Sequence, residues 1–184
     1  MEMLIHQYIN SQIFPCKVVQ ETISSLKSTL TELQLDPDSA SGGMTKKLVS
    51  ALTPYLVSTS WRERWPIDRS VQHNAYASFF IDYSLDEDLQ TCGHHHRYFL
   101  QLMFDNRQAI GTNLMKFEIA SRNSVIGGRS PICIGICAEE SKIRKLGWDG
   151  AAASSQEYLE AINGAYSSVL TNPPLIFSIE KLTN

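Results

Sequence analysis

The spacing of apolar residues changes along the chain from a helical repeat to a strand repeat. In the first third, apolar positions recur at intervals of three and four, so they share one face of a helix. This pattern predicts two N-terminal helices within 14–58, the first over 14–34 and the second from about residue 44. Pro54 should kink or shorten the second helix, because proline lacks the amide hydrogen that a helix interior uses.

From residue 76 onward, apolar and polar residues alternate with a period of two, the pattern of a half-buried strand. The segment "PICIGICA" is almost continuously apolar and is typical of a central strand covered on both faces. The predicted strands are 76–85, 98–104, 131–138 and 175–180, and the predicted helices between them are 107–121 and 154–169. This order predicts an α/β fold, a single domain over 1–184 with a mixed central β-sheet flanked by helices.

Composition agrees with a globular protein, since 43% of the residues are hydrophobic and 19% are charged. No apolar run approaches the ~18 residues that cross a bilayer, so no membrane partner is expected. The segment "MEMLIHQYIN" lacks the basic start of a signal peptide. The four cysteines follow neither a disulfide nor a zinc spacing, so we expect a reduced, cytoplasmic protein.

Charge is unevenly distributed, although the net charge is only −3. The segment 107–145 holds seven basic and three acidic residues, whereas 82–88 holds four acidic residues. A basic surface beside an acidic cluster suits phosphate binding next to a cation, although the same charges could simply face solvent. In "SWRERWP", arginines between two tryptophans could clamp a phosphate backbone or could cover the edge of a core.

The loop between the first two predicted strands carries Cys92, His94, His95 and His96. These side chains could bind Zn²⁺ or Ni²⁺, but consecutive histidines rarely reach one ion, and an exposed polar loop is the simpler interpretation. Glu118 is another candidate acid, and its helical spacing favours a surface salt bridge.

The segments "FFIDYSL", "YFLQLMFDN", "SPICIGICAEE" and "SSQEYLEAINGAYSSVLTNPPLIFSIE" occur in an order that resembles the PD-(D/E)xK nucleases. More narrowly, the chain resembles type II restriction endonucleases of the BglII and BamHI kind, with a degenerate catalytic motif. The resemblance implies a restriction-endonuclease-like core over 75–181. In that family, an Asp on the first strand and a Glu on the second bind Mg²⁺, and a Lys, Glu or Gln two positions later orients the attacking water.

Carried onto this chain, the resemblance places Asp82 at the first position, Gln101 at the position of the Glu, and Met103 at the third. The implied metal ligands are therefore Asp82 and Gln101. The chain departs from the family here, because a neutral amide removes one negative charge and a thioether is a poor ligand for Mg²⁺. Considered without the resemblance, Met103 is expected to fill space in the hydrophobic core.

The resemblance also implies DNA contacts just beyond the second strand, and in the segment "LGWDGAAAS". Arg107 could contact guanine and Asn106 adenine, while Asp105 or Asn106 could instead cap the next helix. The implied DNA-binding residues are Asp105, Asn106, Arg107, Lys142, Arg144 and Lys145.

These observations favour a homodimeric protein that binds double-stranded DNA, with Mg²⁺ as cofactor if it is active. Its phosphodiester hydrolysis is expected to be impaired or lost. Two alternatives stay open: an active site-specific endonuclease with a variant metal site, and an interaction protein that uses the same scaffold without DNA. The target sequence does not follow from these residues.

Overall fold

The computed structural model describes residues 2–8, 16–33, 43–67, 80–87, 93–144, 147 and 150–183, with backbone alone for 2–8, 141 and 181–183. The strands are β1 (Glu2–Tyr8), β2 (Arg62–Pro66), β3 (Phe80–Asp86), β4 (His95–Leu102), β5 (Arg129–Ala138) and β6 (Leu175–Thr183). The helices are α1 (Lys17–Glu32), α2 (Met44–Ser58), α3 (Ile110–Ile126) and α4 (Ser155–Asn163), with 3-10 turns η2 (Arg107–Ala109) and η3 (Glu140–Lys142).

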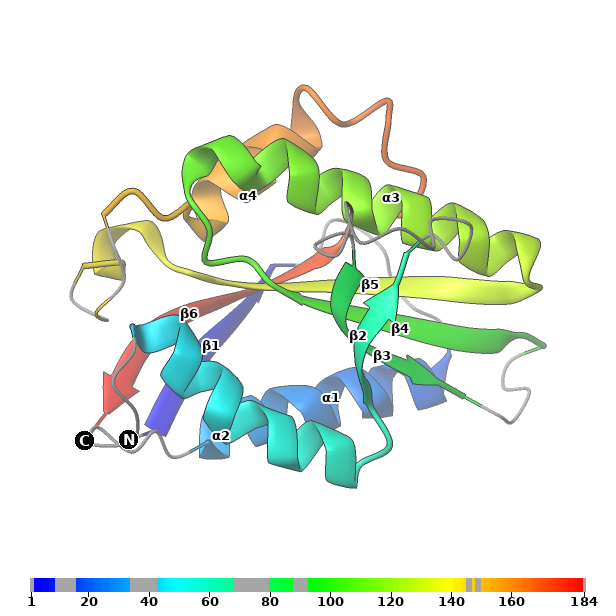
Figure 1. Ribbon diagram of the computed structural model, residues 1–184, viewed down its shortest axis with the longest axis horizontal. Helices are drawn as coiled ribbons and strands as arrows, with labels where there is room; N and C mark the ends of the chain where they lie inside the picture. Colours follow the sequence, from blue (N-terminus) through cyan, green and yellow to red (C-terminus); the bar gives the residue numbers. More distant parts are fainter. Residues whose placement is uncertain are drawn as a thin grey trace.

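The strands form one six-stranded mixed sheet in the order β1-β6-β5-β4-β3-β2. The pairs β4–β5 and β5–β6 are parallel, and the other pairs are antiparallel. Parallel neighbours need a crossover connection, and α3 and α4 provide the two crossovers. Figure 1 shows the result, with α1 and α2 below the sheet and α3 and α4 above it. The predicted α/β architecture is thereby confirmed.

Each face of the sheet has its own hydrophobic core. The lower core joins the apolar stripes of α1 and α2 to Tyr98, Leu100 and Leu102, on one face of β4. The upper core joins α3 and α4 to Phe99 and Met103, which lie between the lower-core residues in sequence and point to the other face. A continuous apolar run in β5 is needed because this strand is covered on both faces. Gln101 lies between Phe99 and Met103, so it belongs to the face under α3.

Two strands were absent from the sequence expectation, and both are at the edges of the sheet. Within the described part of the chain, β1 pairs with β6 alone and β2 pairs with β3 alone. β2 has the sequence RERWP and is mostly exposed, so it lacks the apolar alternation that marks a half-buried strand. Of the two tryptophans in "SWRERWP", Trp61 precedes β2 and is buried in the lower core, and Trp65 within β2 packs partly against the upper one.

Element ends also differ from expectation. α2 continues to Ser58, four residues past Pro54, so the proline does not end it. The predicted helix 154–169 ends as an α-helix at Asn163, and Gly164 lies outside the helical region. Gly111 in α3 leaves room for Tyr166, because an added Cβ would lie 2.3 Å from the Tyr166 hydroxyl oxygen and this side chain would have to shift. Residues 76–79 of the first predicted strand, and 14–15 and 34 of the first helix, lie outside the described residues.

The cysteines depart in part from the reduced state that was expected. Cys133 and Cys137 are free, buried thiols on β5. Cys16 is the N-cap residue before α1 and is disulfide-bonded, while Cys92 lies outside the described residues. Within the part of the chain that is described, no helix has the length and apolarity to cross a membrane.

Candidate functional site

Asp82 and Gln101 lie side by side on neighbouring strands. The β3–β4 register pairs Tyr83 with Leu100, so the next position places Asp82 opposite Gln101. The Asp82 backbone N–H donates to Gln101 Oε1 at 3.3 Å, and the Leu102 N–H donates to Asp82 Oδ2 at 2.7 Å. The Asp82 carboxylate thus accepts a backbone N–H just beyond the last regular pair of β3 and β4, Tyr83 with Leu100. The tertiary structure brings together the first two residues of the predicted site.

The Asp82 carboxylate is held in a partly buried position. Burial raises its pKa above the ordinary value of an aspartate, and the nearby Asp105 carboxylate acts in the same direction. The Leu102 N–H, the Lys116 ammonium and the Gln101 side chain oppose this rise in pKa. Because burial outweighs these partners, a bound cation would stabilise the ionised form of Asp82.

Gln101 and Met103 are more buried than Asp82. Gln101 is 3% exposed and Met103 is fully buried in the upper core. The Met103 side chain covers Gly135 so closely that a Cβ at Gly135 would lie 2.1 Å from Met103 Cε. This position therefore holds core packing, and a soft thioether there cannot orient a water molecule.

The donors at this site suit Mg²⁺ only in part. Asp82 offers a carboxylate and Gln101 an amide oxygen, both hard ligands, but together they carry a single negative charge. Among the described residues, no three His, Cys, Asp or Glu side chains gather as a metal site would require. Mg²⁺ often keeps several waters and binds through one or two carboxylates and a substrate phosphate. These two residues would need such additional ligands to hold the ion.

The two segments expected to contact bases lie against each other. The Arg107 N–H donates to the Ala151 carbonyl at 3.2 Å, and the Ala153 N–H donates to the Asp105 carbonyl at 2.9 Å. The loop after β4 and the loop before α4 therefore form one surface. Of the segment "LGWDGAAAS", residues 146, 148 and 149 lie outside the described part of the chain.

The side chains of this surface have partners within the protein. Asn106 caps η2 by accepting the Gln108 N–H at 3.1 Å, and Asp105 accepts from Asn113 Nδ2 at 3.2 Å. Arg107 forms an ion pair with Glu157 and donates to the Gly150 carbonyl at 3.1 Å. Asn106 is therefore the helix cap that was the alternative to a base contact. Arg107 would have to give up Glu157 or the Gly150 carbonyl before it could contact a base.

Charged residues farther along the chain are divided between ion pairs and solvent. Lys142 in η3 is half-buried, Arg144 is exposed, and Lys145 lies outside the described residues. Arg129 lies 3.8 Å from Asp86, which also forms an ion pair with Arg97. Part of the acidic cluster at 82–88 is therefore neutralised by basic side chains within the fold.

The three histidines do not converge. His95 begins β4, so the side chains at 94, 95 and 96 alternate in direction. The rings of His94 and His96 lie 6.3 Å apart between centroids. His96 is buried, and its Nδ1 lies 3.2 Å from Glu87 Oε2. The Tyr98 hydroxyl donates to the same carboxylate at 2.6 Å.

Glu118 forms a salt bridge, with Arg122, but it is a buried residue rather than the surface residue that was expected. Its side chain is 1% exposed. Its carboxylate accepts the Thr171 N–H at 2.7 Å and the Thr171 hydroxyl at 3.0 and 3.1 Å. Burial raises the pKa of Glu118, but the Thr171 and Arg122 hydrogen bonds outweigh burial and lower it overall. Glu118 therefore anchors the loop before β6 to α3.

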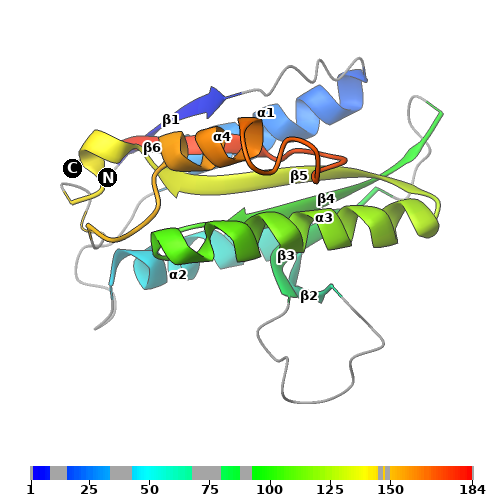
Figure 2. The same cartoon turned by 90° about the horizontal axis from the view of Figure 1, so that it is seen from above.

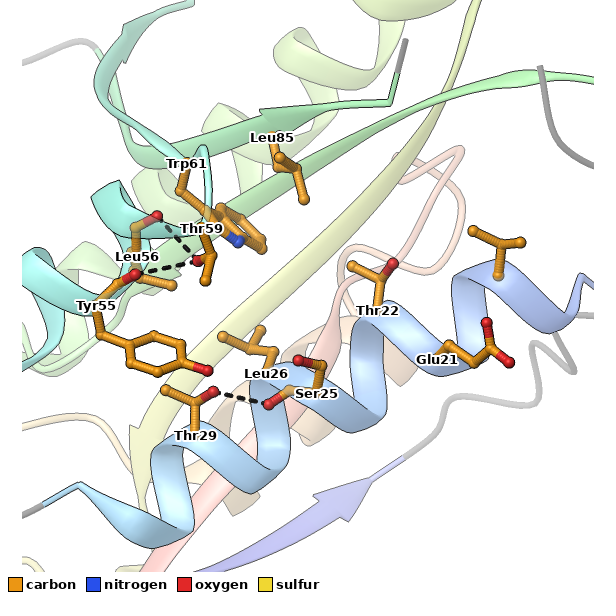
Figure 3. A pocket seen from close by; sticks show the side chains of 11 residues that line it. Glu21, Thr22, Ser25, Leu26, Thr29, Tyr55, Leu56, Thr59, Trp61 and Leu85 are labelled. Carbon is orange, nitrogen blue, oxygen red and sulfur yellow. Dashed lines mark hydrogen bonds between the residues drawn. The ribbon is translucent and has the colours of Figure 1, made fainter. Parts of the chain in front are cut away.

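A surface cavity of about 310 Å³ lies between α1 and α2, on the opposite side of the sheet from Gln101 (Figure 3). Two of its hydroxyl groups are engaged by helix carbonyls. Thr29 donates to the Ser25 carbonyl at 2.8 Å, and Thr59 donates to the carbonyls of Tyr55 and Leu56. Among the described residues of the lining, Glu21 is the single carboxylic acid, so these residues do not form a convergent set of catalytic groups.

One cation near Asp82 was not assigned to the site from the sequence. Lys116 comes from α3, and its ammonium opposes the rise in the pKa of Asp82. The arginines of "SWRERWP" had been considered as phosphate contacts, and the pairing of β2 with β3 places Arg62 opposite Ser84 and the backbone of Arg64 across from Asp82. Lys116 was counted among the basic residues of 107–145, but nothing in the neighbouring sequence linked it to Asp82.

Comparison with known proteins identifies the fold. No protein-family model matches the chain, and no curated protein is similar to it in sequence. Among solved structures, the chain is similar to the restriction endonuclease BglII complexed with a DNA 16-mer. The TM-score is 0.62 at 13% sequence identity, over 100% of this chain and 78% of that chain. The protein therefore has an α/β fold of the restriction-endonuclease type.

Proposed function

We propose that this protein binds double-stranded DNA on a restriction-endonuclease-like scaffold whose Mg²⁺-dependent hydrolysis is impaired or lost. The observation that carries the proposal is the state of the three motif positions. Asp82 keeps its carboxylate beside Gln101, while Gln101 contributes a neutral amide and Met103 is buried in the core. A site with one charge fewer binds a divalent cation more weakly, and position 103 has no group that can activate water.

The proposal separates binding from cleavage, so the test measures both. Gel shifts of plasmid fragments in Ca²⁺ report binding, and conversion of supercoiled plasmid with Mg²⁺ or Mn²⁺ reports nicking and cleavage. We expect a shift without conversion. Asp82→Asn keeps an acceptor for the Leu102 N–H, so it should remain folded and bind DNA. A wild-type protein that shifts no duplex would refute the proposal and favour an interaction protein without DNA.

A second candidate is an active endonuclease with a variant metal site. It is favoured by Asp105, whose carboxylate lies close enough to Asp82 to raise its pKa. A second carboxylate near the first would restore the charge that Gln101 lacks. Plasmid cleavage by the wild type that disappears in both Asp82→Asn and Asp105→Asn would establish this alternative.

The proposed assembly is a two-fold homodimer, because a palindromic site presents two identical half-sites. We assign the interface to α3 and α4. Support comes from the end of α3, where Val125 is 59% and Ile126 is 84% exposed. Light scattering should give a dimer at micromolar concentration, and Ile126→Lys should shift it toward the monomer. A monomer with and without DNA would contradict the assembly.

A further inference from the structure

The cavity between α1 and α2 is lined by a largely buried tryptophan whose indole N–H is unsatisfied. Trp61, in the turn between α2 and β2, is one of the lining residues and is 6% exposed. Its ring packs at a tilt against Tyr98, with the ring centroids 6.3 Å apart. Among the described residues, no group accepts a hydrogen bond from its indole nitrogen. A buried tryptophan N–H usually has such a partner, so this one requires a physical explanation.

The indole N–H borders open space and is not sealed in the core. Within the described part of the chain, every side-chain nitrogen or oxygen that is fully shielded from solvent has a partner, so an N–H without one must border accessible space. Trp61 is otherwise enclosed, and the cavity is accessible space that it lines. Figure 3 shows its ring turned into the cavity, between Thr59 and Leu26. A rigidly held donor is therefore available to a bound molecule.

The rest of the lining combines an apolar floor with polar groups at the mouth. Leu26 and Leu56 are buried, and they present hydrocarbon to the cavity from α1 and α2. Ser25 and Tyr55 are exposed side chains on the same two helices. Among the described residues, neither of their hydroxyl groups has a hydrogen-bond partner. The mouth thus offers two hydroxyls that can donate or accept, above a floor that favours an apolar ligand surface.

The charges in the lining are negative. Glu21 lines this cavity, and Glu32 lines an adjoining cavity of about 490 Å³ that shares Thr29 and Tyr55 with it. Glu21 lies 3.5 Å from Lys17, but both side chains are well exposed, so this ion pair is weak. None of the described residues that line the two cavities is a lysine or an arginine. The lining therefore disfavours an anionic ligand and favours a hydrogen-bond donor at the mouth.

The size and position of the cavity suit a small molecule at a place separate from Asp82. A volume of about 310 Å³ is near the lower end of the range for small-ligand sites, which is roughly 300–1,000 Å³. In Figure 2, which looks down on α3 and α4, α2 lies behind the sheet. The cavity is thus on the opposite face of the sheet from Gln101. A hydrocarbon alone would leave the Trp61 N–H without an acceptor.

We propose that the α1–α2 cavity binds an uncharged heteroaromatic amine. The flat faces of the ring pack against Leu26 and Leu56, and a ring nitrogen accepts the hydrogen bond of the Trp61 indole. The amino group of the ligand lies at the mouth and donates to the oxygens of Ser25, Tyr55 or Glu21. This binding is independent of DNA, because it uses neither the sheet face nor the loops that the proposed function uses.

The test compares two probes that differ only in their ring acceptors. Quinazolin-4-amine has ring nitrogens, whereas naphthalen-1-amine has the same fused-ring shape and amino group without them. Titration calorimetry measures the affinity of each probe for the protein. The wild type should prefer quinazolin-4-amine by about three- to tenfold, the contribution of one neutral hydrogen bond.

Two pairs of variants locate this preference. Trp61→Phe keeps an aromatic ring but removes the N–H, so it should bind the two probes about equally. Its control is Trp65→Phe, which changes a tryptophan packed against the upper core and should keep the preference. Ser25→Phe places a ring at the mouth from an exposed position and should weaken both probes about tenfold or more. Its control is Ser24→Phe, at an exposed position of α1 outside the lining.

Thermal unfolding shows which variants fold, and the Ser25 and Ser24 pair decides the matter if Trp61→Phe does not. Failure of the wild type to bind quinazolin-4-amine at millimolar concentration would overturn the proposal. So would equal wild-type affinity for the two probes, or a preference that survives in Trp61→Phe. Equal affinities in Ser25→Phe and Ser24→Phe would show that the probe binds elsewhere and would also overturn it.

Discussion

The substitution Gln101→Glu tests whether the residues beside Asp82 form the remains of a metal site. Glutamate is nearly the same size as glutamine and keeps an oxygen that can accept the Asp82 N–H. It adds a second carboxylate directly across the β3–β4 pair, at a position that is 3% exposed. The change restores the charge of the family pattern without altering the shape of the core.

Without a metal ion, the second carboxylate should destabilise the protein. Side chains directly opposite on antiparallel strands lie about 5 Å apart, so two ionised carboxylates at an effective dielectric of about 20 repel by about 3 kcal/mol. Protonating one of them at pH 7 costs a similar amount, about 3–4 kcal/mol, because each pKa unit corresponds to 1.36 kcal/mol. For a chain of this size, the loss should lower Tm by about 6–12 °C.

A divalent cation should reverse this loss. An ion that binds only the folded state at 100 times its Kd stabilises that state by about 2.7 kcal/mol. Thermal unfolding of wild type and Gln101→Glu is therefore measured across a Mn²⁺ titration, with plasmid cleavage followed in parallel. The variant should recover most of its lost Tm, whereas the wild type, with one carboxylate fewer, should gain much less.

The charge control is Gln20→Glu, which adds a carboxylate to an exposed position of α1 on the opposite face. It should lose little stability and gain none with Mn²⁺. If Gln101→Glu is destabilised but gains no more from Mn²⁺ than this control, the oxygens at 82 and 101 do not converge on an ion. The metal-site interpretation would then be wrong.

Three further predictions concern the buried Glu118, the packing of Gly135 on Met103, and DNA binding by three basic residues. Glu118→Gln should lose about 1.5–3 kcal/mol at pH 7, since the charged carboxylate holds the Thr171 N–H and hydroxyl. The folded pKa of Glu118 is lowered, so its contribution exists above the ordinary pKa of about 4.3 and is lost as pH falls; denaturation at pH 3 should show a smaller difference. Gly135→Ala should cost about 1–3 kcal/mol, and combining it with Met103→Ala should cost less than the sum, because a Cβ at 135 would lie 2.1 Å from Met103 Cε. An additive double mutant would show that the two positions do not touch. Alanine at three basic positions should weaken binding to all duplexes about equally and lower the salt slope by roughly one per contact, and an unchanged gel shift would leave them as a solvated surface. These positions are Lys142, Arg144 and Lys145.

Hydrophobic period alone determined much of the core architecture. The repeat of three and four predicted both N-terminal helices, and the change of pattern after residue 76, to alternation and to the continuous apolar run "PICIGICA", predicted the four strands that became β3, β4, β5 and β6. These elements are predictable because each buries a stripe or a face against the core, which requires apolar residues at the matching period. The position of Asp82 on one strand and of Gln101 on the next followed from the same alternation.

The edge strands and the partners of charged residues were decided only by the tertiary structure. Among the described strands, β1 and β2 lie at the two edges of the sheet, and the residues of β2 are mostly exposed, so its sequence carries no strand period. Arg107 pairs with Glu157, fifty residues away along the chain, and Glu118 accepts the N–H of Thr171, 53 residues away. Local sequence specifies backbone period because neighbouring residues share one element. It does not specify which distant charges meet, because that depends on strand register and helix placement in the folded chain.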